Sequence, residues 1–131
     1  MKHQSFNVLL ADDDPAVCLI LSTILRRLGN TVEVVGNGKE AIALLASKSG
    51  FFEILITDHN MPLVSGLEVV NYVRKNEFEG RIMVISGFLT DELTKAYIAK
   101  RVDKILQKPF TIETLSSTLS DTMDQWRRAA I

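Results

Sequence analysis

Short apolar runs alternate with amphipathic segments along the whole chain, and this alternation restricts the fold more than any other feature. Runs of about four to five apolar residues alternate with amphipathic segments of about ten to fifteen, which is typical of repeated strand–helix units. The apolar runs lack an in–out alternation, as expected for parallel strands covered on both faces. The sequence therefore predicts an α/β protein with strands near 7–11, 31–35, 53–57, 81–86 and 102–107.

The segments between these strands carry signals that begin helices. Asp14 followed by Pro15 predicts an N-cap and a first helical residue for a helix near 15–28. Later helices are expected to begin at Asn37-Gly38, Ser65-Gly66, Thr90-Asp91-Glu92 and Thr111. Strand–helix units occupy the chain throughout, so we expect a single domain over 1–131 with a core of about 6–123 and no output domain.

Composition and charge argue against several classes of function. Lys and Arg number 15 against 16 Asp and Glu, so the net charge of -1 gives no general attraction to nucleic acid. The apolar runs fall far short of the roughly 20 residues of a membrane helix, and residues 1–5 are too short and polar for a signal peptide. The single cysteine, Cys18, cannot form an internal disulfide. We therefore expect a cytoplasmic protein with a plain buried thiol, and neither a direct nucleic-acid partner nor a membrane.

Residues that suit phosphoryl chemistry stand at the ends of the predicted strands. They are two acids after the first strand, one acid after the third, a hydroxyl at the end of the fourth and an ammonium after the fifth: Asp12, Asp13, Asp58, Ser86 and Lys108. In an open parallel sheet the carboxyl ends of the strands open on one edge, where ligands bind at the topological switch point. The sequence therefore predicts that these side chains share one pocket.

A cluster of carboxylates at this edge favours a metal ion and a phosphoryl group. Three neighbouring carboxylates repel one another, which raises their pKa values unless a cation shares the site. Mg²⁺, or Mn²⁺ in its place, suits such a site because it binds a few carboxylates together with phosphate. One carboxylate can then act as a nucleophile toward phosphorus and form an aspartyl phosphate. Lys108 is expected to pair with one phosphoryl oxygen, and the Ser86 hydroxyl to donate to another.

With these residues the chain resembles the receiver domain of two-component response regulators, from about Phe6 to Met123. The resemblance depends on five ordered motifs, which are Leu10-Ala11-Asp12-Asp13-Asp14-Pro15, Asn37-Gly38-Lys39-Glu40-Ala41, Thr57-Asp58-His59-Asn60-Met61-Pro62 with Ser65-Gly66, Ile85-Ser86-Gly87 and Lys108-Pro109-Phe110. It implies a doubly wound (βα)5 three-layer sandwich whose parallel five-stranded sheet has the order 2-1-3-4-5.

The resemblance also implies a role for each residue of the expected pocket. Asp58 would be the phosphoacceptor, and Lys108 would contact the phosphoryl group. Asp12 and Asp13 would bind Mg²⁺, with Asp58 and the backbone carbonyl of Asn60 as further metal ligands. These roles describe a signalling phosphoacceptor, which promotes its own phosphorylation and dephosphorylation, rather than an enzyme.

The switching residues both follow and depart from the pattern of the family. Ser86 would be the hydroxyl that moves toward the phosphoryl group. Three residues before the lysine, where many receivers carry an inward-swinging Tyr or Phe, this chain has Ile105, so an aromatic toggle is absent there. After Ser86, the pair Phe88-Leu89 either presents apolar surface on a loop or packs on the core. His59 has no partner at metal-ligand spacing and is interpreted as a loop residue bordering the pocket.

Partners follow from the same resemblance. A sensor histidine kinase or a histidine phosphotransfer protein would supply the phosphoryl group, and the changed surface would act on a downstream protein target. The chain would work as a monomer or as a weak dimer that depends on phosphorylation. Signal would then leave by protein contact or by onward phosphoryl transfer.

Two other classes of function remain open from the sequence. A haloacid-dehalogenase-type phosphatase also forms an aspartyl phosphate with Mg²⁺, and Asp12 and Asp14 after an apolar strand fit its nucleophile motif. That enzyme would leave Asp58 without a central role, and its final acidic motif is missing because Asp121 and Asp124 lie on a predicted helix. A binding module that never takes a phosphoryl group is the third interpretation.

Overall fold

Strands and helices alternate along residues 5–129, the part of the chain that the computed structural model describes. The strands are β1 (Asn7–Ala11), β2 (Thr31–Val35), β3 (Ile54–Asp58), β4 (Arg81–Ser86) and β5 (Lys104–Gln107). The helices are α1 (Pro15–Arg27), α2 (Gly38–Ser47), α3 (Gly66–Lys75), α4 (Asp91–Ala99) and α5 (Ile112–Ala129). The predicted units are all present, although β3 covers 54–58 rather than 53–57 and β5 covers 104–107 rather than 102–107.

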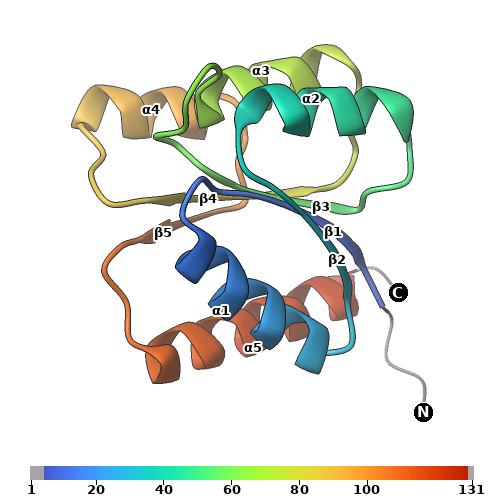
Figure 1. Ribbon diagram of the computed structural model, residues 1–131, viewed down its shortest axis with the longest axis vertical. Helices are drawn as coiled ribbons and strands as arrows, with labels where there is room; N and C mark the ends of the chain where they lie inside the picture. Colours follow the sequence, from blue (N-terminus) through green and yellow to red (C-terminus); the bar gives the residue numbers. More distant parts are fainter. Residues whose placement is uncertain (1–4, 130–131) are drawn as a thin grey trace.

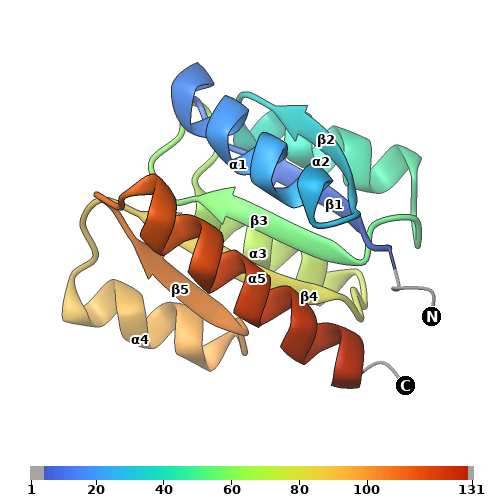
Figure 2. The same cartoon turned by 90° about the horizontal axis from the view of Figure 1, so that it is seen from below.

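The strands form one parallel sheet in the middle of a three-layer sandwich. The strand order is β2-β1-β3-β4-β5, and every neighbouring pair is parallel. Helices α2, α3 and α4 cover one face of the sheet, and α1 and α5 cover the other (Figure 1). Viewed from below, α1 and α5 lie across the sheet side by side (Figure 2). The predicted α/β class and strand order are confirmed.

The central strands are apolar on both sides because helices cover both sides. All residues of β3 are buried, and so are those of β4 after its first residue. Alternate residues of one strand therefore belong to different cores: Leu10 packs in the core under α1 and α5, and Leu9 in the core under α2, α3 and α4. Among the described residues, no helix combines the length and apolarity needed to cross a bilayer.

The late start of β5 follows from the turn after α4 and from the contacts that Asp103 makes with β4. Arg101 has a φ of 60°, in the left-handed region, so the chain turns sharply after α4. The Asp103 carboxylate then accepts hydrogen bonds from the Ile82 backbone N–H at 2.8 Å and from Arg81 Nη1 at 3.1 Å. Val102 and Asp103 therefore belong to the turn, and strand pairing begins at Lys104.

The sheet order places one crevice at the carboxyl ends of β1 and β3. These strands are neighbours in the sheet, but the chain leaves β1 for α1 on one face and leaves β3 for α3 on the opposite face. The two connections therefore diverge, which opens the edge of the sheet between them. Residues that end or directly follow β1 and β3 border this crevice.

Candidate functional site

Carboxylates from two neighbouring strand ends gather at this crevice. Asp12 directly follows β1 and is 1% exposed, and Asp58 is the last residue of β3 and is 4% exposed. Asp13 is exposed beside them. One carboxylate oxygen from each of these three residues lies within 4.8 Å of the others. The structure thus brings together the three acids that the sequence predicted to share a pocket.

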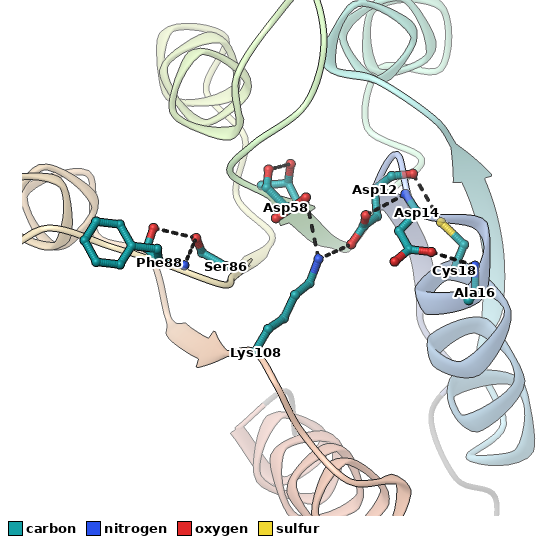
Figure 3. A network of polar contacts seen from close by, with 9 residues as sticks. Asp12, Asp14, Ala16, Cys18, Asp58, Ser86, Phe88 and Lys108 are labelled. Carbon is teal, nitrogen blue, oxygen red and sulfur yellow. Dashed lines mark hydrogen bonds and ion pairs between the residues drawn. The ribbon is translucent and has the colours of Figure 1, made fainter.

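Lys108 reaches between the two buried acids from the end of the edge strand β5 (Figure 3). It follows β5 and precedes Pro109 across a cis peptide bond. Its Nζ donates a hydrogen bond to Asp12 Oδ2 at 3.2 Å and lies 3.6 Å from Asp58 Oδ2. Burial alone would lower the pKa of Lys108, but the carboxylates of Asp12 and Asp58 outweigh burial and raise it. The ammonium therefore stays charged in the pocket.

The loop after β1 holds Asp12 in place. The Asp14 backbone N–H donates to Asp12 Oδ1 at 2.9 Å, and Asp14 Oδ1 in turn accepts from the Ala16 N–H at 2.9 Å as the N-cap of α1. The Cys18 thiol donates to the Asp12 carbonyl at 3.2 Å. Burial, and then the charge of Asp12, raise the pKa of the Cys18 thiol to about 11. Cys18 is thus the plain buried thiol that the sequence predicted, because it stays protonated at neutral pH.

Asp58 is poorly accommodated as a bare carboxylate. Burial raises its pKa from 3.8 to about 6, the negative charge of Asp12 adds to the rise, and the charge of Lys108 opposes it without cancelling it. Two buried acids and an exposed one face a single ammonium, so negative charge is in excess at the site. A divalent cation corrects this excess.

The donor set fits a hard divalent cation. Carboxylate oxygens of Asp12, Asp13 and Asp58 are the hard ligands that Mg²⁺ prefers. Asn60 lies exposed in the loop after β3, and no backbone hydrogen bond among the described residues uses its carbonyl oxygen. The role of this carbonyl as a further metal ligand, which the resemblance implies, stays a prediction.

Ser86 faces away from the acids in this structure. It is the last residue of β4 and is fully buried. Its hydroxyl donates to the Phe88 carbonyl at 3.0 Å and accepts from the Phe88 N–H at 3.3 Å, so it points along the β4–α4 loop rather than toward Asp58 (Figure 3). The Phe88 side chain is 72% exposed, whereas Leu89 packs partly buried on the core. The interpretation that both pack on the core is therefore wrong for Phe88.

Sequence reasoning missed one contact of the site, between His59 and Tyr97. His59 Nδ1 lies 2.5 Å from the Tyr97 hydroxyl oxygen, and the rings meet edge to face with centroids 5.6 Å apart. Burial lowers the pKa of His59, so its ring is neutral at pH 7. Burial, and then the charge of Asp58, raise the pKa of Tyr97. The helical spacing from Leu93 to Tyr97 indicates a buried tyrosine, but no local pattern pairs it with a residue 38 positions away.

Fold and site together define a class of protein. A doubly wound sandwich with the order β2-β1-β3-β4-β5, and with acids and a lysine gathered at the switch point, is a flavodoxin-like fold with an acidic cluster that could hold a metal ion. The family model of the response regulator receiver domain matches residues 8–120. The chain belongs to this family.

Relatives agree with this assignment. The chain is 32% identical over 117 residues to the transcription factor SKN7 of Saccharomyces cerevisiae, which covers 89% of this chain and 18% of that protein. It is 26% identical over 121 residues to the sensor kinase CckA of Brucella abortus, which covers 92% of this chain and 13% of that protein. The chain thus spans less than a fifth of the length of either relative. The solved structure of the chemotaxis protein CheY4 of Vibrio cholerae is 30% identical, with a TM-score of 0.77, over 90% of this chain and 98% of that one.

Proposed function

We propose that this chain accepts a phosphoryl group on Asp58 from the phosphohistidine of a sensor kinase or of a histidine phosphotransfer protein, in a Mg²⁺-dependent reaction. The observation that carries the proposal is the position of the Asp58 carboxylate beside Asp12, within 3.6 Å of the Lys108 ammonium. A nucleophilic carboxylate, a metal-binding acid and a fixed cation are the groups that an aspartyl phosphate requires.

Each residue of the pocket has a part in the reaction. Asp12, Asp13, Asp58 and the Asn60 carbonyl would hold Mg²⁺, or Mn²⁺ in its place, and the ion would neutralise charge on the transferring phosphoryl group. An Asp58 oxygen forms the new O–P bond while the N–P bond of the phosphohistidine breaks and its electron pair returns to the imidazole. Lys108 already lies beside Asp58, and it would pair with a phosphoryl oxygen.

Phosphorylation would switch the surface by changing the partners of Ser86. In the unphosphorylated state the Ser86 hydroxyl is held by the backbone of Phe88. A hydrogen bond to the phosphoryl group would release these bonds, so the β4–α4 loop would move and carry the exposed Phe88 with it. Ile105 is half-buried in β5 and has no polar tip to follow this movement. Hydrolysis of the acyl phosphate would reset the switch.

The chain would act as a single receiver unit over 1–131. Its output would be contact with a downstream protein or onward transfer to a phosphotransfer protein, as a monomer or a weak phosphorylation-dependent dimer. Neither nucleic acid nor a membrane takes part in these steps. We expect the reaction in the cytoplasm.

Intact-mass measurement after incubation with acetyl phosphate tests the proposal. We expect one labile phosphoryl adduct that requires Mg²⁺, that is absent in Asp58→Asn, and that persists in the control Asp121→Asn, which changes an exposed acid of α5. An adduct that forms equally in Asp58→Asn contradicts the proposal. Sustained hydrolysis of p-nitrophenyl phosphate that survives Asp58→Asn but not Asp12→Asn would indicate the phosphatase. No reaction under any condition would favour the module that never takes a phosphoryl group.

A further inference from the structure

Helix α4 packs on the core with one fully buried side chain. Tyr97 is the only buried residue of α4, and it packs in the core under α2, α3 and α4. Leu93, one turn earlier, is partly buried on the same core, whereas Ile98 is 62% exposed. The position of α4 therefore depends strongly on where the Tyr97 ring is held.

The polar tip of Tyr97 lies against His59, the residue after Asp58. A buried hydroxyl needs a hydrogen-bond partner, and His59 Nδ1 lies 2.5 Å from the Tyr97 hydroxyl oxygen. The Tyr97 hydroxyl and His59 Nδ1 therefore share a hydrogen bond. His59 directly follows Asp58 in the chain. One hydrogen bond thus joins α4 to the residue next to the reacting carboxylate.

The backbone around His59 makes this contact tight. The His59 N–H donates to the Ile85 carbonyl at 3.1 Å, and the His59 carbonyl accepts from the Gly66 N–H at 2.9 Å. A Cβ at Gly66 would lie 2.3 Å from the Asp58 carbonyl oxygen and 3.0 Å from the Tyr97 hydroxyl oxygen. The end of β3, the start of α3 and the tip of Tyr97 therefore fill one junction. The main chain at Asp58 and the tip of Tyr97 thus both lie against Gly66.

We infer that the hydrogen bond from Tyr97 to His59 couples the Asp58 site to α4, with Tyr97 and His59 acting as positioning residues. The inference deepens the proposed function and rests on it. Metal binding or phosphorylation at Asp58 moves the loop that begins at His59, and the buried hydroxyl transmits this movement to the helix. Ile105 makes no such polar link from β5.

The size of the effect follows from the strength of one hydrogen bond. Coupling between a site and a helix equals the difference in interaction free energy between their two states. A hydrogen bond of ordinary net strength that is made in only one of the two states changes their equilibrium by about 2- to 13-fold. We therefore expect removal of the Tyr97 hydroxyl to lower the response of α4 by a factor in this range while the helix stays folded.

Amide chemical shifts of α4 test the inference. They are measured for Asp91–Ala99 without ligand, with saturating Mg²⁺ alone, and with Mg²⁺ and acetyl phosphate. The α4 amides of the unmodified chain are expected to shift with each addition. Tyr97→Phe, which keeps the ring, is expected to lower these shift changes by about 2-fold or more. The control Tyr72→Phe alters the other tyrosine of the chain, half-buried on α3, and is expected to leave them unchanged.

Variants of His59 show whether the effect passes through the hydrogen bond. His59→Leu removes the partner of the Tyr97 hydroxyl, so its α4 shift changes are expected to match those of Tyr97→Phe. The double variant is expected to show α4 shift changes as large as those of either single variant, because both changes remove the same hydrogen bond. His59→Asn places an amide oxygen near the position of Nδ1 and is expected to restore part of the response. An unchanged α4 response in Tyr97→Phe, additive effects in the double variant, or no α4 response in the unmodified chain would overturn the inference.

Intact mass on the same samples separates this inference from the proposed function. If the unmodified chain gains no phosphoryl group, the proposed function fails, and the Mg²⁺ data alone decide the inference. If the unmodified chain and Tyr97→Phe are both phosphorylated on Asp58 and their α4 shifts agree, the inference fails and the proposed function stands.

Discussion

Asp58→Asn is expected to stabilise the metal-free protein at neutral and alkaline pH, although it removes the residue on which the function depends. Asp58 is 4% exposed, and burial together with the charge of Asp12 raises its pKa from 3.8 to about 6. The folded state therefore holds the Asp58 proton more tightly than the unfolded state does. The free energy of unfolding falls as pH rises from about 4 to about 6, and the full loss is present above pH 6.

The magnitude follows from the two pKa values. The difference between 3.8 and about 6 corresponds to about 3 kcal/mol, and the opposing charge of Lys108 is already contained in it. An uncharged amide at position 58 avoids this cost, and Lys108 keeps its hydrogen bond to Asp12. For a chain of 131 residues the gain corresponds to a rise in melting temperature of roughly 10 °C.

Thermal melts in EDTA between pH 3.5 and pH 8 measure this difference. We expect Asp58→Asn to melt above the unmodified chain at pH 8, and the gap to close near pH 4. The exposed control Asp121→Asn is expected to show no such gap. Mg²⁺ at 100 times its dissociation constant should nearly close the gap at pH 8, since it adds about 2.7 kcal/mol to the protein that binds it, against a cost of about 3 kcal/mol. Equal melting temperatures of Asp58→Asn and the unmodified chain at pH 8, or a gap that does not depend on pH, would refute the argument.

Three further predictions concern the same edge of the sheet. Asp13 is exposed, so Asp13→Asn is expected to weaken Mg²⁺ binding in a calorimetric titration while changing metal-free stability by less than about 0.5 kcal/mol; unchanged metal affinity would contradict its role. Lys108→Met removes the charge that lowers the pKa of Asp58, so the midpoint of the Asp58 titration, followed by NMR, should move above about 6, and a downward move would contradict the electrostatic account. Gly66→Ala places a Cβ 2.3 Å from the Asp58 carbonyl oxygen and is expected to lower the free energy of unfolding, measured in urea, by at least about 2 kcal/mol. The control Gly36→Ala has open space around the added Cβ and should lower it by less than about 1 kcal/mol. Equal losses in the two variants would contradict the argument, because they would show that the protein relaxes around the contact at Gly66.

The site residues at the ends of the strands were predictable from the sequence, because a polar residue interrupts each apolar run there. Asp12, Asp58 and Lys108 each end or follow an apolar run, and parallel pairing brings such positions to one edge whatever the details of packing. The N-cap role of Asp14 was predictable from its neighbour, because Pro15 favours the first turn of a helix. Local sequence is sufficient for these features because each depends on residues that are adjacent in the chain.

Other features depend on contacts between distant segments, which local patterns do not contain. In the turn before β5, the Asp103 carboxylate accepts a hydrogen bond from the Ile82 backbone N–H, so β5 begins at Lys104 rather than at the predicted residue 102. The orientation of Ser86 depends on the path of the backbone at Phe88. The pairing of His59 with Tyr97 depends on how α4 packs on α3 and the end of β3. These contacts form between residues that only the folded structure brings together, so the sequence alone does not predict them.

Locating the phosphoryl group on the chain tests the central claim most directly. The protein is incubated with acetyl phosphate and Mg²⁺, treated with borohydride to reduce any acyl phosphate to an alcohol, digested and sequenced by tandem mass spectrometry. We expect homoserine at position 58 alone, and aspartate there when Mg²⁺ is replaced by EDTA. Homoserine at Asp12 or Asp13, with aspartate intact at position 58, would contradict the account.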